Sequence, residues 1–196
     1  RYPVTQAIWQ AVMGENPSEF KGDNRPVESI SWNDAQKFIE KLSLMTSQDF
    51  CLPTEAQWEY AARGGRKSLG FDYSGSNHLK EVGWYRENSY GETKPVGLKF
   101  ANELGFYDMS GNVWEWCADW YDSDYYVACA KEGVVTDPPG PEQGSRRVLR
   151  GGGYFDRAVR CRPASRHFNH PADRWNFYGV RLALPASQVE AKGAFP

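Results

Sequence analysis

The sequence predicts an α+β fold that is rich in loops and has little regular secondary structure. Short amphipathic helices with capping signals alternate with short strand-like runs, whereas residues 66–104 and 122–145 show no apolar period. Aromatic residues make up 15% of the 196 residues, with eight tryptophans. We therefore expect a core of large rings that holds the loops in place by packing.

Three helices are predicted, each after a hydroxyl side chain that can cap its first turn. They cover residues 6–13 after Thr5, 32–42 after Ser31 and 55–63 after Thr54. Asp34 and Gln57 stand three residues after the second and third caps, which is the spacing of a capping box. Gly14 and Gly64 are expected to end the first and third helices. The apolar residues of the second helix share one face: Ala35, Phe38, Ile39 and Leu42.

Short strands are predicted at residues 2–4, 27–30 and 113–117, the last of them after a tight turn at residues 110–112. We interpret residues 122–145 as a long loop and residues 185–196 as a frayed terminus. No internal repeat and no linker divides the chain, so residues 1–196 are predicted to form a single domain.

Residues 147–184 have the most unusual pattern. Residues 147–152 and 179–183 form a frame of arginine, glycine and aliphatic residues, while the positions between them are aromatic, basic and polar with no helix or strand period. Eight arginines against two aspartates give this segment a charge of +6, in a chain whose net charge is −2. The pattern is typical of a binding surface on a scaffold, and many of the arginines are expected to pair within the fold.

The four cysteines, Cys51, Cys117, Cys129 and Cys161, match no metal or redox spacing. Free thiols are the favoured interpretation, and one disulfide is the alternative. The net charge of −2 argues against a general nucleic-acid binder. No run reaches the ~20 apolar residues of a membrane span. The chain begins with Arg1 and shows no signal peptide, so we expect any targeting or lipid signal to lie upstream.

Four motifs resemble, in order, the formylglycine-generating enzyme (sulfatase-modifying factor) family. They are VESISWNDA at 27–35, LPTEAQWEYAARGG at 52–65, GNVWEW at 111–116, and RVLRGG at 147–152 followed by GVR at 179–181. The resemblance covers almost the whole chain. It implies a C-type-lectin-like fold of the formylglycine-generating enzyme type, in agreement with the loop-rich pattern.

We call residues 147–184 the closing segment. The oxidase chemistry of that family requires two cysteines in the corresponding part of the enzyme. The resemblance places Asp156 at the first of these positions and Cys161 near the second. One thiol cannot supply both thiolates of a copper site. The iron-dependent relatives need clustered histidines, whereas this chain has only His78, His167 and His170. We therefore predict a non-catalytic protein, and a formylglycine-generating-type oxidoreductase with an altered active site is the alternative.

The closing segment also resembles the variable proteins of diversity-generating retroelements, of the treponemal type. In that group, adenine-directed mutagenesis rewrites asparagine-type codons in a way that never yields Lys, Glu, Gln, Met or Trp. Residues 147–184 contain no Lys, Glu, Gln or Met, although the rest of the chain has nine Lys and fourteen Glu. Their one Trp, Trp175, is explained by an arginine-type codon instead. The resemblance implies a receptor- or adhesin-like binding protein at the cell surface or otherwise outside the cytoplasm.

Under this interpretation the unpatterned positions are the ligand-binding residues. They are Tyr154, Phe155, Asp156, Arg157, Val159, Arg160, His167, Phe168, Asn169, His170, Ala172, Trp175, Asn176 and Phe177. Tyr, Phe, Trp and Arg are typical of binding hot spots. We expect a variable macromolecular ligand, a protein rather than a nucleic acid, and a monomeric receptor. The alternative for Phe168, Phe177 and Tyr178 is that they fill the core.

The family resemblance further implies a structural calcium ion, and no other cofactor is required. Its ligands would be Gly111, Val113 and Glu115, with Ser110 adjacent. Oxygen ligands suit a hard cation. The alternative is an ion pair of Glu115 with Arg150 or Arg181, and the sequence leaves both possibilities open.

Overall fold

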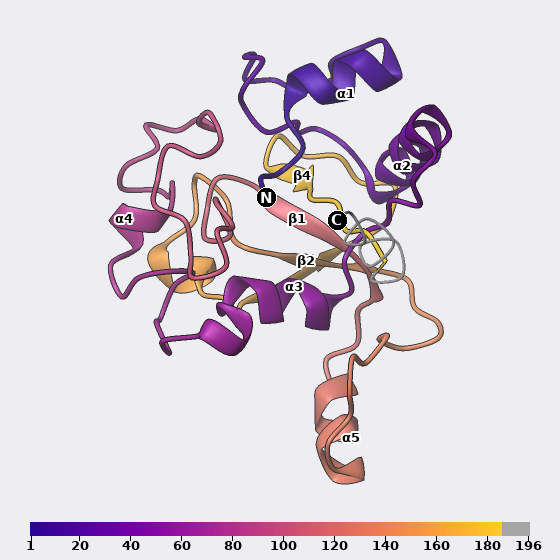
Figure 1. Cartoon of the computed structure of the whole chain (residues 1–196), viewed down its shortest axis with the longest axis vertical. Helices are drawn as coiled ribbons and strands as arrows, with labels where there is room; N and C mark the ends of the chain where they lie inside the picture. Colours follow the sequence, from indigo (N-terminus) through magenta and orange to yellow (C-terminus); the bar gives the residue numbers. More distant parts are fainter. Residues whose placement is uncertain (186–196) are drawn as a thin grey trace, which may run out of the picture.

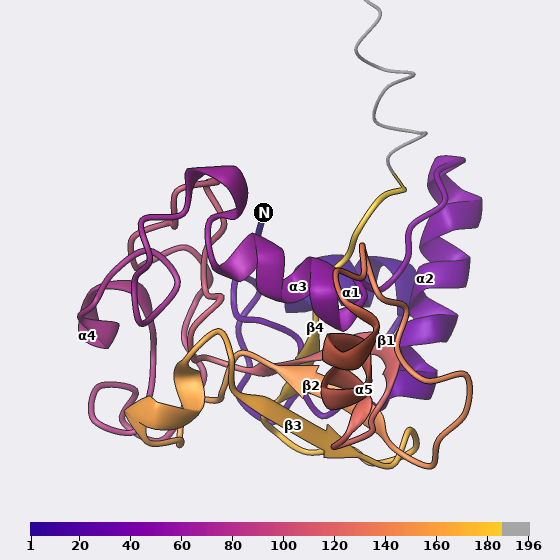
Figure 2. The ribbon, with the colours of Figure 1, turned by 90° about the horizontal axis from the view of Figure 1, so that it is seen from below.

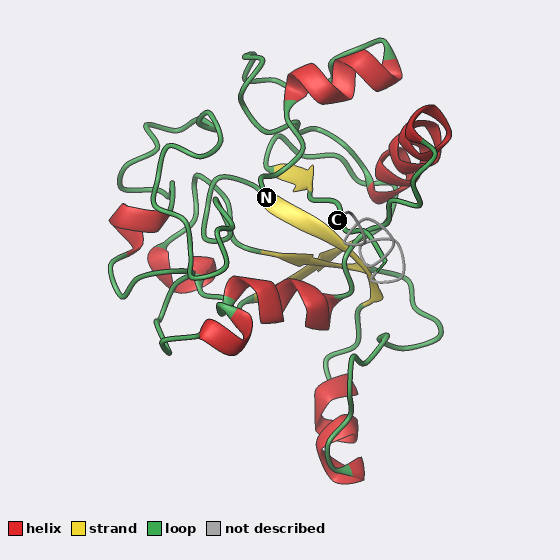
Figure 3. Cartoon of the chain, viewed as in Figure 1, coloured by secondary structure: helices red, strands yellow, loops and turns green. Residues whose placement is uncertain are grey.

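The structure is a computed structural model that describes residues 1–185 (Figure 1). The helices are α1 Gln6–Met13, α2 Trp32–Thr46, α3 Glu55–Ala62, α4 Leu79–Val82 and α5 Tyr125–Glu132, and the strands are β1 Trp114–Trp120, β2 Arg147–Arg150, β3 Arg166–Asn169 and β4 Tyr178–Val180. Two 3₁₀ turns, η1 Gly65–Lys67 and η2 Ala158–Cys161, complete the set. Loops connect these elements over most of the chain (Figure 3). The α+β, loop-rich prediction is confirmed.

The four strands form one sheet in the order β3-β2-β1-β4. β2 pairs antiparallel with both β1 and β3, whereas β4 runs parallel to β1. The central strand β1 is buried on both faces for most of its length. In Figure 2, α1 and α3 lie on one side of the sheet, and β3 and the orange η2 turn lie at the opposite side. The closing segment therefore contributes three of the four strands. One of them, β3, forms the edge of the sheet on the side away from α1 and α3.

The predicted caps are present. Thr5 accepts a hydrogen bond from the Ile8 amide, and Ser31 and Thr54 each form a complete capping box. α2 continues one turn past the predicted end at Leu42 because no Gly or Pro interrupts it, and it stops where Ser47 adopts a left-handed conformation with φ 54°.

Two of the predicted strands are wrong. Residues 2–4 and 27–30 lie beside the sheet and exchange single backbone hydrogen bonds, among them Val4 N to Val180 O at 2.8 Å. Pro3 has no amide hydrogen to donate, and Ser29 has a φ of 62°, so neither segment continues as a ladder. The predicted strand at residues 113–117 is confirmed, and β1 extends it to Trp120.

The interpretation of residues 122–145 as loop alone is also wrong, because α5 lies within them. Every residue of α5 is at least partly exposed, so the helix carries no buried apolar stripe that a sequence pattern could reveal. Figure 1 shows α5 projecting away from the body of the molecule. The prediction of a frayed terminus at residues 185–196 lies, apart from residue 185, outside the described residues.

The core is built from large rings, as the composition predicts. Trp9 and Phe38 stack with their centroids 4.7 Å apart, and Trp116 contacts Tyr178 edge-on. Trp58 and Trp114 are also almost completely buried. No helix in the described residues is both long and apolar enough to cross a bilayer.

Candidate ligand-binding surface

Two of the three frame arginines, Arg150 and Arg181, are buried and pair with acids of the scaffold. Arg150 is fully buried and donates to Glu55 at 2.7 Å and to Glu59 at 2.5 Å. Burial by itself lowers the pKa of Arg150, but the charges of Glu59 and Glu55 outweigh it and raise the pKa. Arg166, on the next strand, reaches both oxygens of Glu55. Arg147 is held between the rings of Trp32 and Trp120. The basic charge of the frame is thus largely used within the fold, as the sequence indicates.

Glu115 pairs with Arg181. Nε and NH2 of Arg181 each lie 2.9 Å from a different oxygen of the carboxylate, and Trp58 Nε1 donates to one of these oxygens at 2.7 Å. Both partners are buried. Of the two possibilities for Glu115, the ion pair is present. Calcium at Gly111, Val113 and Glu115 stays a prediction, and the described residues contain no cluster of three acidic, His or Cys side chains.

The predicted contact residues include a connected set of rings, which we name the aromatic belt: Tyr154, Phe155, His167, Phe168, Trp175 and Phe177. Phe177 is at its centre, with its centroid 4.5 Å from that of Phe155 and 5.9 Å from that of Trp175. Phe177 also contacts the buried Tyr178, whose ring reaches His167. Residues that lie more than twenty positions apart in the sequence therefore meet on one face.

The belt is graded in exposure, which separates ligand-facing from supporting positions. The exposed predicted residues are Phe155, Arg157, Val159, Arg160, His170, Ala172 and Trp175, the half-buried ones are Asp156, His167, Phe168, Asn169, Asn176 and Phe177, and Tyr154 is buried. Trp175 is 53% exposed and Phe155 42%, whereas Tyr154 is only 6% exposed. Tyr154 is therefore a support in this structure, packed edge-on against Phe20 and Phe155.

His167 lies in the interior of the belt. Its Nε2 is 2.9 Å from the hydroxyl of Tyr178. The same hydroxyl accepts a hydrogen bond from the side-chain Nδ2 of Asn169 at 3.1 Å. Burial, followed by the charge of Arg160, lowers the pKa of His167. The ring is therefore neutral at pH 7 and serves the belt as an aromatic and hydrogen-bonding group.

Asp156 is held by the scaffold. Its Oδ2 accepts hydrogen bonds from Trp114 Nε1 at 2.7 Å and from the Gly153 amide at 2.9 Å. The resemblance places a catalytic cysteine at this position. Here the carboxylate closes the turn that carries Phe155 outward, and it connects that turn to the central strand.

The loops of the surface are tied down by backbone hydrogen bonds. Trp114 N donates to Phe177 O, and Ser29 N donates to Trp175 O. Gly152 allows the chain to pass against Cys161, because a Cβ there would lie 2.7 Å from the thiol sulfur. Such anchoring leaves little backbone freedom to lose when a ligand binds.

Several residues outside the closing segment belong to this surface, and sequence reasoning did not identify them. Phe20 contacts Tyr154, and the ring centroids of Tyr121 and Phe168 lie 4.0 Å apart. Glu19 accepts a hydrogen bond from the side-chain amide of Asn176. The backbone N–H of Arg86 donates a hydrogen bond to the backbone carbonyl oxygen of Asp156. They lie in loops without a motif, so only the tertiary structure brings them to the site.

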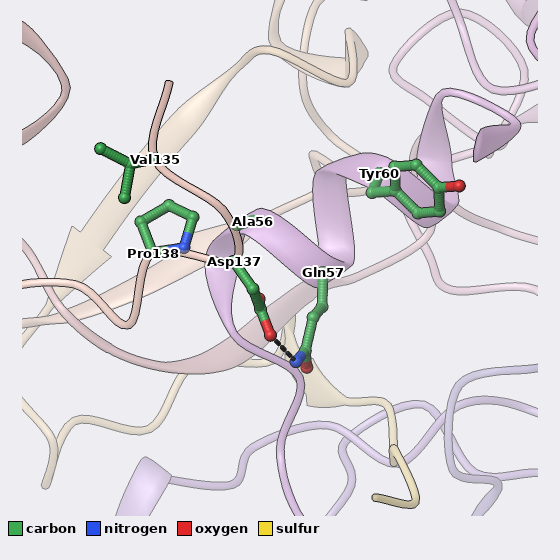
Figure 4. Close-up of a pocket in the computed structure, with 6 residues that line it drawn as sticks. All are labelled: Ala56, Gln57, Tyr60, Val135, Asp137 and Pro138. Atoms are coloured by element: carbon green, nitrogen blue, oxygen red, sulfur yellow. Dashed lines mark hydrogen bonds between the residues drawn. The ribbon is translucent and has the colours of Figure 1, made fainter. Parts of the chain in front are cut away.

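The described hollows lie elsewhere. One, of ≈ 390 Å³, is lined by Ala56, Gln57, Tyr60, Val135, Asp137 and Pro138, with Gln57 donating to Asp137 at 2.9 Å (Figure 4). A second, of ≈ 420 Å³, lies on the other flank of α3, between Glu59 and Tyr126. Neither of these two hollows is lined by a predicted contact residue.

All four cysteines are free, as favoured by the sequence. Cys117 and Cys161 are buried, and burial raises the pKa of both thiols. At Cys161 the neighbouring Asp156 charge adds to this effect. A thiol with a raised pKa is a poor thiolate donor at neutral pH.

Comparison with known proteins confirms the resemblance. Among solved structures, Treponema denticola variable protein 1 matches with a TM-score of 0.83 and 34% identity, over 93% of this chain and 84% of that protein. The chaperone protein LppX of Paenibacillus barcinonensis is 38% identical over 79% of this chain and 68% of its own length. The formylglycine-generating enzyme of Thermomonospora curvata is 36% identical over 92% of this chain, which spans 62% of that enzyme.

The expected fold is confirmed by the same comparisons. The described chain has the C-type-lectin-like fold of the formylglycine-generating enzyme type, with a small curled sheet and few helices. The sequence model of the family described as sulfatase-modifying factor enzyme 1-like domain matches residues 1–186. The chain belongs to the sulfatase-modifying factor enzyme 1-like domain family.

Proposed function

We propose that the chain is a non-catalytic ligand-binding protein whose residues 147–184 form a diversified binding surface on a lectin-like scaffold. The observation that carries this proposal is the division of the segment. Two of its frame arginines pair inward with Glu55, Glu59 and Glu115, whereas its unpatterned residues include a belt of rings that meet on one anchored face. The likeness to a treponemal variable protein supports the same function.

The ligand would be a macromolecule, and a protein fits best because the face is broad and carries exposed aromatic and arginine side chains. We propose a monomeric receptor- or adhesin-like protein that acts outside the cytoplasm. The net charge of −2 disfavours nucleic acid as the ligand.

A peptide selection tests the binding surface. Peptides selected from a random library on the wild-type protein should bind Phe155→Ala and Trp175→Ala about tenfold or more weakly, because exposed aromatic side chains dominate such contacts. Phe100→Ala is the matched control, since Phe100 is an exposed ring outside the segment. If the selected peptides bind both belt variants as tightly as the control, the proposed surface is wrong.

The second candidate is a formylglycine-generating-type oxidoreductase with an altered site, and the 36% identity to a formylglycine-generating enzyme favours it. The residues argue against it, because Asp156 is committed to Trp114 and Cys161 is buried with a raised pKa. Incubation with copper, oxygen, a thiol reductant and a cysteine-containing substrate peptide separates the two candidates, because the reduction of O₂ to water during the reaction takes two electrons from the added thiol. Conversion of the peptide cysteine to formylglycine would establish the enzyme.

A further inference from the structure

Three exposed arginines gather at the η2 end of the aromatic belt, and we name them the arginine patch: Arg86, Arg157 and Arg160. The backbone brings them together. Arg160 N donates to Arg157 O at 2.9 Å within the 3₁₀ turn, where residues three apart lie one above the other. Arg86 N donates to Asp156 O at 3.0 Å, which places its loop beside the same turn.

Within the described part of the chain, none of the three guanidinium groups forms an ion pair. Two other exposed arginines do form one: Arg63 pairs with Glu59 and Arg174 with Asp34. Arg160 lies 5.2 Å from the ring centre of Trp114. The positive charge of this patch is therefore not neutralised by the fold.

Two acids are close to the patch, and both are already engaged. Asp156 accepts hydrogen bonds from Trp114 and Gly153, and Glu87 accepts one from the Tyr85 hydroxyl. Each of these carboxylates has one oxygen engaged in this way, and no ion pair with an arginine of the patch is present among the described residues. Three arginines against the two carboxylates of Asp156 and Glu87 leave an excess of one positive charge at this end of the belt.

The arginine patch is continuous with the exposed part of the belt. Phe155 stands between Tyr154 and Asp156 and contacts Phe177, which in turn stacks near Trp175. Val159, 55% exposed, lies between the two arginines of the η2 turn. A ligand that covers this face meets unpaired cations at one end and exposed rings at the other.

We infer that the ligand is a protein segment with acidic and apolar residues side by side, whose carboxylates bind the arginine patch while its apolar side chains cover Phe155 and Trp175. This inference rests on the proposed function. Arginine forms bidentate hydrogen bonds with carboxylates and is enriched at the centres of protein interfaces. Both parts of the surface contribute to selectivity. A basic peptide segment is repelled by the arginine patch, and an acidic segment without apolar residues leaves Phe155 and Trp175 uncovered.

A polyanion such as DNA or a sulfated glycan fits this face less well. Such ligands need a line of positive charge along their backbone. Here the charge is interrupted along the belt: at the Trp175 end Arg174 is paired with Asp34, and the unpaired arginines among the described residues include the arginine patch and Arg146, 4.9 Å from the Phe168 ring centre.

The selected peptides also test this inference. Peptides that depend on Phe155 and Trp175 should be enriched in Asp and Glu next to apolar residues. Their affinity should fall about tenfold in Arg157→Ala and in Arg160→Ala, and it should weaken as NaCl rises from 50 to 300 mM. Arg66→Ala is the matched control, because Arg66 is an exposed arginine of η1 without an ion pair among the described residues.

Two further probes complete the design: a synthetic peptide of alternating Glu and Phe, and its counterpart with Lys in place of Glu. The acidic peptide should bind more tightly than the basic one and than heparin or single-stranded DNA. Equal binding of both peptides, no effect of the arginine variants, or tighter binding of either polyanion would overturn the inference. Belt-dependent peptides without acidic enrichment would do the same and leave the proposed function standing.

Discussion

Replacing Arg181 with methionine tests whether the inward pairing of the frame arginines stabilises the scaffold. The Arg181 side chain is 5% exposed and that of Glu115 1%. The change removes two hydrogen bonds to the carboxylate and leaves the carbonyls of Arg1 and Tyr107 without their guanidinium donors. Of the side-chain hydrogen bonds to this carboxylate within residues 1–185, that from Trp58 Nε1 would remain.

The magnitude follows from that burial. Removing one partner of a buried ion pair typically costs about 3–5 kcal/mol. A small domain has only about 5–15 kcal/mol of stability in total. With a slope of about 2–3 kcal/mol per molar urea, the unfolding midpoint should fall by about 1–2.5 M.

Arg174→Met is the matched control for this experiment. Arg174 also binds both oxygens of an acid, at 2.7 and 2.8 Å on Asp34, but its side chain is 57% exposed. An exposed pair contributes about 0–1 kcal/mol, so its midpoint should hardly move. The double variant Glu115→Gln with Arg181→Met should lose less free energy of unfolding than the two single variants lose when their losses are added. The reasoning is refuted if Arg181→Met and Arg174→Met lower the midpoint equally, or if the cycle is additive.

Three further predictions concern titration, thiols and calcium. Burial raises the pKa of Asp119 to about 7, although it accepts the Glu55 amide. Since this folded-state pKa exceeds the unfolded value of about 3.9, the associated stability is fully present below pH ~4 and is lost as the pH rises through 7. Urea midpoints should therefore fall from pH 5 to pH 8, and Asp119→Asn should reduce that fall. Cys117 and Cys161 should react with iodoacetamide only on unfolding, whereas the half-exposed Cys129 reacts in the native protein, as mass spectrometry would reveal. Rapid native labelling of Cys161 would count against the buried thiol and for the oxidoreductase alternative. Because Arg181 occupies both oxygens of Glu115, exchange of EDTA for calcium chloride should leave the melting temperature within about 1 °C. A rise of several degrees that Glu115→Gln removes would establish the calcium site.

The sequence predicts best where the interactions are local. Ser31 with Asp34, and Thr54 with Gln57, carry their own capping information, and both helices start where the caps predict. The inward role of the frame arginines was also predictable, because a short frame with so many arginines needs internal acids. Which acid each arginine binds was not, since Arg181 and Glu115 are far apart in the sequence.

The sequence fails where a segment depends on distant partners or on none. Residues 2–4 look like a strand, yet their backbone reaches the sheet through isolated bonds because Pro3 cannot donate. α5 has the opposite problem, because it packs against so little that no apolar stripe marks it. Within the candidate surface, the sequence identifies Phe155 and Trp175 as candidates but cannot separate them from the buried Tyr154, whose neighbour Phe20 comes from another loop.

The exposure gradient of the belt explains how one segment could hold a fold and also vary. Phe155, Val159 and Trp175 are exposed, and no hydrogen bond is lost when their side chains are replaced. Substitutions at such positions usually change stability by less than about 0.5 kcal/mol. Asp156 and His167 differ, because their side chains bind Trp114 and Tyr178. If the segment is rewritten in nature, tolerance should be greatest at the exposed positions and smallest at these two, so the surface can change its ligand while the sheet beneath it keeps its packing.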